Sequence, residues 1–347
     1  MTNRILCLAL YTLAALLLAH NTAADELLLR DGSRILGTVK KKEGNTLDFK
    51  TSFAGTVKVN WDQVSELRTD QPAQVLLSNE AVISARVFTN TADSTTVQSE
   101  PDAPARSFRP AEVAFINPEP WRLGQGSKFS GRVNFALESQ RGNTDEDEID
   151  VDGHLLWRRK HDRFTLAGEL EHDKNDGRTT ADNWELSGKY DHFVTRKWFY
   201  GGYLFAEADD FADLTLRLGA GPGVGHQFFE SEELNLSTEL GLIRVYEDFQ
   251  TQENDKYWAA GWMINFDKYI LPDLFKSYHL QLYHRNNGLW NLYSTSDVIW
   301  NTWTGLRFPL ILGLVASTEV KFEYDSGAAP DADEVDTTYT LKLGYQW

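Results

Sequence analysis

The chain ends in Thr338-Tyr339-Thr340-Leu341-Lys342-Leu343-Gly344-Tyr345-Gln346-Trp347, a segment in which apolar and polar residues alternate. Successive side chains of a β-strand point to opposite faces. One face of this segment is therefore apolar and aromatic, and the other carries threonine, lysine, glycine and glutamine. That division indicates a strand in a wall with lipid on one side and water or polar side chains on the other.

The same alternation recurs upstream. We count 12 alternating segments, centred on residues 129–137, 149–157, 164–172, 184–192, 198–206, 214–224, 234–246, 257–266, 278–285, 298–308, 312–324 and 337–347. Tight turns alternate with longer acidic connections along this region. Short periplasmic turns and longer extracellular loops are the rule for membrane barrels. The sequence therefore predicts an all-β fold with a 12-stranded antiparallel transmembrane β-barrel.

The first 24 residues predict a secretory signal peptide. Arg4 is their only charge, an apolar run follows, and Thr22-Ala23-Ala24 supplies small residues for cleavage. Cys7 is the only cysteine of the chain, so a processed chain would have no disulfide and no cysteine metal site. A mean hydropathy of −0.42 would also suit a soluble secreted β-protein. The concentration of tryptophan and tyrosine after residue 120 favours the barrel, which places aromatic residues at both membrane interfaces.

Residues 25–117 contain an internal repeat, with copies at about 25–70 and 73–117. Leu28-Leu29 aligns with Leu76-Leu77, and Val64 and Leu67 align with Val113 and Ile116. Each copy is too short for a large core, so we expect two SH3- or Sm-like β modules that pack together. Trp61 is expected in this core. Residues 118–124 are the expected linker, and residues 125–347 form the barrel.

The alternation also predicts which charged side chains face the lumen of the barrel. They carry both signs: Arg132, Glu138, Asp152, Arg158, Glu169, Glu185, Arg217, Arg285, Arg307, Glu319 and Lys321. Such a lumen either closes through ion pairs or leaves a thin polar channel.

The long connections predict an acidic mouth at Asp145, Glu146, Asp147, Glu148, Asp331 and Asp333. A rim of one sign raises the local concentration of counter-ions, so cations would be preferred, whereas nucleic acid is disfavoured as a partner. The spacing of a calcium-binding EF-hand is absent, and we assign no metal site and no cofactor. None of the histidines stands in a recognisable catalytic constellation, so the sequence does not indicate an enzyme.

The segment Glu138-Ser139-Gln140-Arg141-Gly142-Asn143-Thr144-Asp145, the charged turn Lys160-His161-Asp162-Arg163 and the terminal aromatic residue resemble the DUF481 family over residues 125–347. These are outer-membrane barrels of the YdiY, or salt-induced, type. The resemblance implies a location in the Gram-negative outer membrane, lipid and the barrel assembly machinery as partners, and Trp347 as the assembly signal. The family usually ends in phenylalanine, and it offers no catalytic residues to transfer.

Three functions stay open from the sequence. The leading expectation is a narrow channel for ions or small solutes with a weak preference for cations. The first alternative is a non-conducting structural or envelope-stress barrel whose periplasmic module binds a partner. The second alternative is an outer-membrane enzyme.

Overall fold

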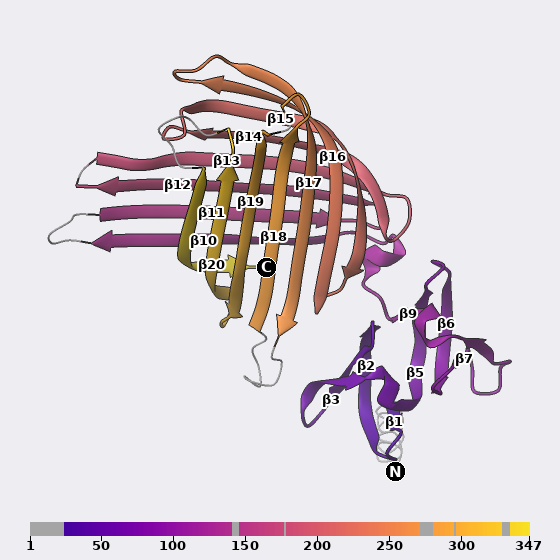
Figure 1. Cartoon of the computed structure of the whole chain (residues 1–347). Helices are drawn as coiled ribbons and strands as arrows, with labels where there is room; N and C mark the ends of the chain where they lie inside the picture. Colours follow the sequence, from indigo (N-terminus) through magenta and orange to yellow (C-terminus); the bar gives the residue numbers. More distant parts are fainter. Residues whose placement is uncertain (1–23, 141–145, 177, 271–279, 295, 328–333) are drawn as a thin grey trace, which may run out of the picture. The chain divides into compact units, whose positions relative to one another are not determined.

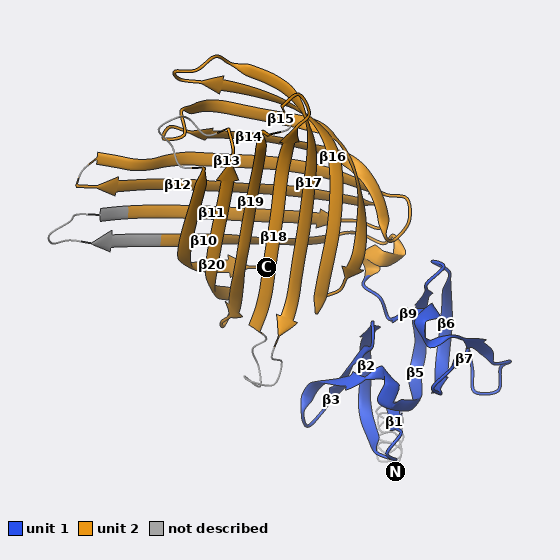
Figure 2. Ribbon diagram, viewed as in Figure 1, with its two compact units in different colours: residues 1–119 blue, residues 120–347 orange. Residues whose placement is uncertain are grey.

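The computed structural model describes residues 24–140, 146–176, 178–270, 280–294, 296–327 and 334–347, with residues 137–140 and 146–147 described by their backbone alone. The expected signal peptide lies outside these ranges. The chain divides into two compact units, Met1–Glu119 and Pro120–Trp347 (Figure 2). Among the described residues, no helix is long and apolar enough to cross a membrane.

The N-terminal unit is a single antiparallel sheet (Figure 1). Its elements are β1 (Asp25–Leu29), β2 (Arg34–Glu43), β3 (Thr46–Thr51), β4 (Gly55–Asn60), η1 (Trp61–Gln63), β5 (Val64–Leu77), β6 (Val82–Asn90), β7 (Thr95–Gln98), β8 (Arg106–Phe108), η2 (Pro110–Glu112) and β9 (Val113–Ile116). The strand order is β4-β3-β2-β1-β5-β6-β7-β8, and β9 pairs with both β2 and β5.

The register of this sheet repeats. β1 pairs Leu29 with Val64 across a bulge, and β5 pairs Leu77 with Val113 across a bulge at the equivalent place. The long strand β5 ends the first copy and begins the second. In addition, the last strand of each copy pairs with the second strand of the other, as β5 with β6 and β9 with β2. The predicted repeats are thus two interlocked halves of one sheet.

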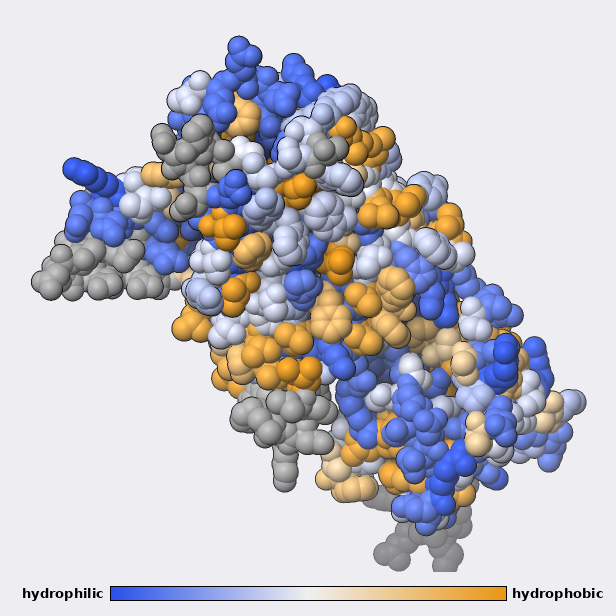
Figure 3. Space-filling model, viewed as in Figure 1, coloured by the Kyte–Doolittle hydropathy of each residue, from blue (hydrophilic) through white to orange (hydrophobic). Residues whose placement is uncertain are grey.

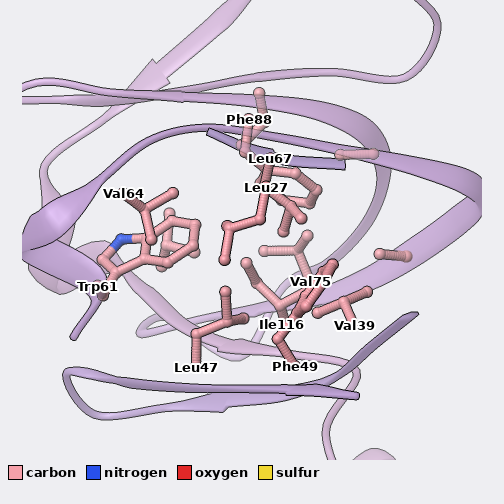
Figure 4. Packing of buried hydrophobic residues seen from close by; sticks show 14 of the residues in the cluster. Leu27, Val39, Leu47, Phe49, Trp61, Val64, Leu67, Val75, Phe88 and Ile116 are labelled. Carbon is pink, nitrogen blue, oxygen red and sulfur yellow. The ribbon is translucent and has the colours of Figure 1, made fainter. Parts of the chain in front are cut away.

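Both halves contribute to one hydrophobic core. Trp61, Phe49 and Leu27 from the first copy meet Phe88 and Ile116 from the second (Figure 4). All five side chains are buried, which confirms the core position expected for Trp61. Because neither half has enough apolar residues to form a separate core, the shared interior explains why the repeats are joined.

The second unit begins with a short turn of 3-10 helix, η3 (Pro120–Leu123), and is otherwise a closed barrel. Its strands are β10 (Lys128–Gln140), β11 (Glu146–Arg158), β12 (Asp162–Asn175), β13 (Arg178–Phe193), β14 (Trp198–Asp209), β15 (Leu214–Glu230), β16 (Leu234–Phe249), β17 (Asp255–Ile270), β18 (Leu280–Asn291), β19 (Val298–Pro309), β20 (Leu314–Asp325) and β21 (Val335–Gln346). Each pairs with the next, and β21 pairs with β10. The predicted 12-stranded antiparallel barrel is confirmed.

The barrel wall has an apolar outer face. Leu341 and Tyr339 on β21 are 77% and 78% exposed, while Lys342 between Leu341 and Leu343 is buried. Large exposed apolar side chains recur around the wall, for example at Phe135, Leu166 and Leu240. Figure 3 shows hydrophobic residues gathered over the middle of the barrel wall and hydrophilic residues over its upper end. An apolar exterior around a charged interior is the two-sided wall of a membrane barrel.

Candidate functional site in the barrel lumen

The candidate site is the interior of the barrel. Arg132, Arg158, Arg217 and Arg307 are buried on the face opposite the exposed apolar residues. The remaining predicted lumen residues with described side chains are partly exposed on the same inner face: Asp152, Glu169, Glu185, Arg285, Glu319 and Lys321. The side chain of Glu138 lies outside the described part of the chain.

The predicted acidic mouth is mostly outside the described residues. Asp145, Asp331 and Asp333 are not described, and neither are the side chains of Glu146 and Asp147. Glu148 is described and is half-buried. The acidic mouth therefore stays a prediction.

Ion pairs cross the lumen between strands that are not neighbours. Lys321 of β20 meets Glu169 of β12 at 3.0 Å. Arg217 of β15 contacts Glu247 at 2.5 Å and reaches Asp325 of β20 at 3.3 Å. The contacts of Lys321 with Glu169 and of Arg217 with Asp325 narrow the interior, because they join parts of the wall that are several strands apart.

A third set of pairs spans the closure of the barrel. The ammonium of Lys342 on β21 lies 2.9 Å from Asp150, 3.1 Å from Asp152 and 3.0 Å from Glu319. Asp150 and Asp152 belong to β11, on the far side of β10. Lys342 therefore links the last strand to the first hairpin from inside the barrel.

The end of the barrel with the short turns is filled by a packed layer. The guanidinium of Arg158 lies 3.9 Å from the ring centre of Phe193 and 4.8 Å from that of Trp121 in η3. Arg158 also forms a 2.8 Å ion pair with Glu230, whose carbonyl accepts a 2.7 Å hydrogen bond from Arg122. We call Trp121, Arg122, Arg158, Phe193 and Glu230 the closing layer.

A cavity of about 60 Å³ opens in the interior wall. Its carboxylates are Glu185, Glu207 and Glu239, and its apolar walls include Phe205 and Ile243. We call it the acidic chamber. Glu207 pairs with Arg217, and Glu239 pairs with Lys189. Glu185 has no ion pair with any residue that the structure describes.

The carboxylates of the acidic chamber do not converge on one point. Among the described residues, no group of three or more histidine, cysteine, aspartate or glutamate side chains is placed to hold a metal ion. The carboxylates of the chamber are instead spread over β13, β14 and β16. Ionised carboxylates spread in this way provide a diffuse negative potential.

Positive charge gathers elsewhere in the lumen. Arg132 of β10, Arg285 of β18 and Arg307 of β19 lie within electrostatic reach of one another, and all three act on His154 of β11. We call these three arginines the arginine cluster. The sequence predicted each as a lumen residue but gave no reason to group them, because they come from strands far apart in the chain.

Sequence reasoning missed several interior residues. Glu207, Glu247 and Asp325 lie just past the predicted segments that end at residues 206, 246 and 324, whereas β14, β16 and β20 include these positions. All three pair with Arg217, so inward-facing side chains continue past the ends of the predicted strands. The sequence feature that could have identified these interior residues is the spacing of charged residues at every second position near the strand ends.

The glycines of β15 have a packing role. A Cβ atom at Gly219 would meet the ring of Phe205, and one at Gly225 would meet the ring of Phe199. These positions let inward aromatic rings lie flat against the wall. The glycines of β15 therefore allow close approach of side chains to the barrel wall.

Comparisons with solved structures give barrels of low similarity. The NanC porin is 9% identical, and the match covers 62% of this chain and 98% of that chain with a TM-score of 0.37. The β domain of the Bordetella autotransporter BrkA is 12% identical, with 64% and 99% covered and a TM-score of 0.31. The channel DcaP of Acinetobacter baumannii is 8% identical, with 64% and 98% covered and a TM-score of 0.29. We therefore argue function from the side chains of the barrel itself.

A search of curated proteins found no match. The family comparison is decisive, because the model described as "Protein of unknown function, DUF481" matches residues 133–347. That range runs from the first barrel strand to the terminal tryptophan and covers more than half of the chain, so the chain belongs to the DUF481 family.

Proposed function

We propose that the protein is an outer-membrane barrel that passes small cations through a narrow lumen. The observation that carries this proposal is the acidic chamber, where Glu185, Glu207 and Glu239 line one cavity. A carboxylate-lined interior of low dielectric attracts cations more strongly than an exposed surface does. The ion pairs across the lumen support a low conductance, because they leave little open cross-section.

We propose that Glu185 is the main source of the cation preference. Its neighbours Glu207 and Glu239 are neutralised by Arg217 and Lys189. Glu185 has no such partner among the described residues, so its carboxylate, when ionised, is available to a passing ion. Its electrostatic neighbours include Glu169 and Glu207, which add to the negative potential.

The test is the reversal potential of the purified, reconstituted protein under a potassium chloride gradient. We expect a modest cation preference at low salt that decreases at high salt, because the Debye length falls from about 10 Å at 0.1 M to about 3 Å at 1 M. Glu185→Gln should reduce the preference at a pH high enough to ionise Glu185. Glu100→Gln, in the N-terminal unit, is the matched control and should leave it unchanged. Anion selectivity would contradict the proposal.

A non-conducting structural barrel is the second candidate. The closing layer and the ion pairs across the lumen favour it, because both fill space. A silent bilayer from folded protein would select this candidate. We propose in either case that the N-terminal unit lies in the periplasm, that the protein is not an enzyme, and that the assembly machinery recognises the strand ending at Trp347.

A further inference from the structure

The arginine cluster has donors that the fold leaves unused. Arg132 is 8% exposed, and its buried Nε has no hydrogen-bond partner within the described part of the chain. Arg307 is 4% exposed. Its Nη1 donates to Asp267 at 2.8 Å and Gln281 at 3.0 Å, whereas its buried Nη2 has no partner there. Two buried guanidinium groups thus present unsatisfied donors in one region of the lumen.

Like charges also accumulate at this place. The charges of Arg285 and Arg307 both act unfavourably on Arg132. Burial of a charge without a partner is costly, and so is the approach of like charges in a medium of low dielectric. Both costs fall if an anion lies among the three guanidinium groups. We propose that the arginine cluster binds a small monoanionic carboxylate.

The local charge balance selects a monoanion. Asp267 is already paired with Arg307, and Asp152 lies 3.1 Å from Lys342. These two carboxylates offset part of the positive charge that faces Arg132. The remaining positive charge of the arginine cluster therefore suits a singly charged anion better than a dianionic phosphate.

The geometry of the donors suits a carboxylate. A guanidinium group presents parallel N–H donors that match the two oxygens of a carboxylate. The guanidinium carbon of Arg307 lies 3.7 Å from the ring centre of Tyr283, a cation–π contact that favours this position of the side chain. Arg285 is only half-buried, so one face of the cluster is open to the lumen.

This site goes beyond the proposed cation passage and does not depend on it. The arginine cluster lies on β10, β18 and β19, while the carboxylates of the acidic chamber lie on β13, β14 and β16. Binding at the cluster can occur in a conducting or a silent barrel. The test therefore measures binding directly, without current.

The probe is trifluoroacetate, whose fluorine resonance broadens when it binds to the folded protein in detergent at fixed ionic strength. We expect broadening with the unaltered protein and reversal by acetate. Arg132→Gln and Arg285→Gln should each weaken binding about tenfold, because each removes charge-assisted hydrogen bonds. Using two variants keeps the test valid if one of them fails to give the heat-modifiable gel shift of a folded barrel.

Lys189→Gln is the matched control, because Lys189 is a lumen cation that is paired with Glu239 in the acidic chamber. It should leave the broadening unchanged. If Lys189→Gln lost as much broadening as the arginine variants, the anion would be attracted nonspecifically and the proposed site would be wrong. Unchanged broadening in both arginine variants would also overturn the proposed site. Stronger competition by inorganic phosphate than by acetate would overturn the assignment to a monoanionic carboxylate.

Discussion

At the scale of single residues, Lys42 is the most unusual side chain of the N-terminal unit. It is buried, donates to the carbonyl of Val113 and lies 5.6 Å from the ring centre of Trp61. Burial lowers the pKa of Lys42 to about 8, and the charge of Asp62 partly opposes this shift. The unfolded chain holds a proton on this lysine up to about pH 10.4. Between these values the unfolded state binds more protons, so stability rises with pH.

We therefore predict that amide protection within residues 25–117 increases between pH 7 and about pH 9.5, after correction for intrinsic exchange. Lys42→Met should abolish that increase, because it removes the titrating group while it keeps an unbranched apolar chain. Hydrogen exchange with mass spectrometry measures both. Lys58→Met, at an exposed position of β4, is the control and should retain the increase. A fall in protection over this range in the unaltered protein would contradict the prediction.

At the scale of elements, the junction of β10 and β21 has the shortest run of paired residues in the described barrel. The two strands pair only from Arg132 with Gln346 to Phe135 with Leu343, and two further hydrogen bonds join Gly131 to Trp347. β20 and β21, by contrast, pair along almost their whole length. Ala136 comes next along β10 and lies opposite Asp150 of β11, and Lys342 of β21 reaches both Asp150 and Asp152.

Lys342→Met should therefore destabilise the barrel by about 3–5 kcal/mol, because it leaves buried carboxylates without their cation. Urea unfolding in detergent, followed by the heat-modifiable gel shift, measures this change. Lys256→Met replaces an exposed lysine that contacts the ring of Tyr246 and should cost less than about 1 kcal/mol. Equal costs for the two variants would argue against a special role for Lys342 at this junction.

The short element η3 covers the end of the barrel that has the short turns. Trp121 is 5% exposed and covers Arg158 at the end of the barrel with the short turns. We predict that Trp121→Ala opens the closing layer. In a Cys7→Ser background, a cysteine introduced by Ser187→Cys on the inner face of β13 should then react with a charged thiol reagent about tenfold faster. Trp121→Phe keeps an aromatic ring and is the control.

At the scale of the whole molecule, the barrel wall separates two environments. Leu341 is 77% exposed on the outer face, and Thr340 beside it faces inward. Leu341→Arg should cost about 2–4 kcal/mol in a bilayer if it lies near the midplane, because the charge would face hydrocarbon. Thr340→Arg should cost much less. Unfolding free energies in lipid vesicles measure both, and equal values would contradict the assigned faces.

The sequence alone determined the class of fold, the number of barrel strands and the internal repeat. These features depend on local periodicity, because a strand alternates every two residues and a repeat retains its spacing. The alternation also identified the lumen arginines and the outward Leu341. It failed where the register changes locally. A bulge between Leu214 and Leu216 places Leu214 in the interior, although strict alternation would put both leucines on one face.

Only the tertiary structure decided which interior charges meet. Lys321 pairs with Glu169, which precedes it by more than 150 residues, and the three members of the arginine cluster come from the first strand and from two late ones. Closure of the barrel brings such strands together, and the stagger between β10 and β21 fixes which residues share a level. The three-dimensional fold also brings Arg122 of η3 to Glu230 of β15. The alternation of residues along a strand predicts whether a side chain points into the lumen or toward lipid. Which charged residue it meets across the lumen depends on how the sheet closes into a barrel.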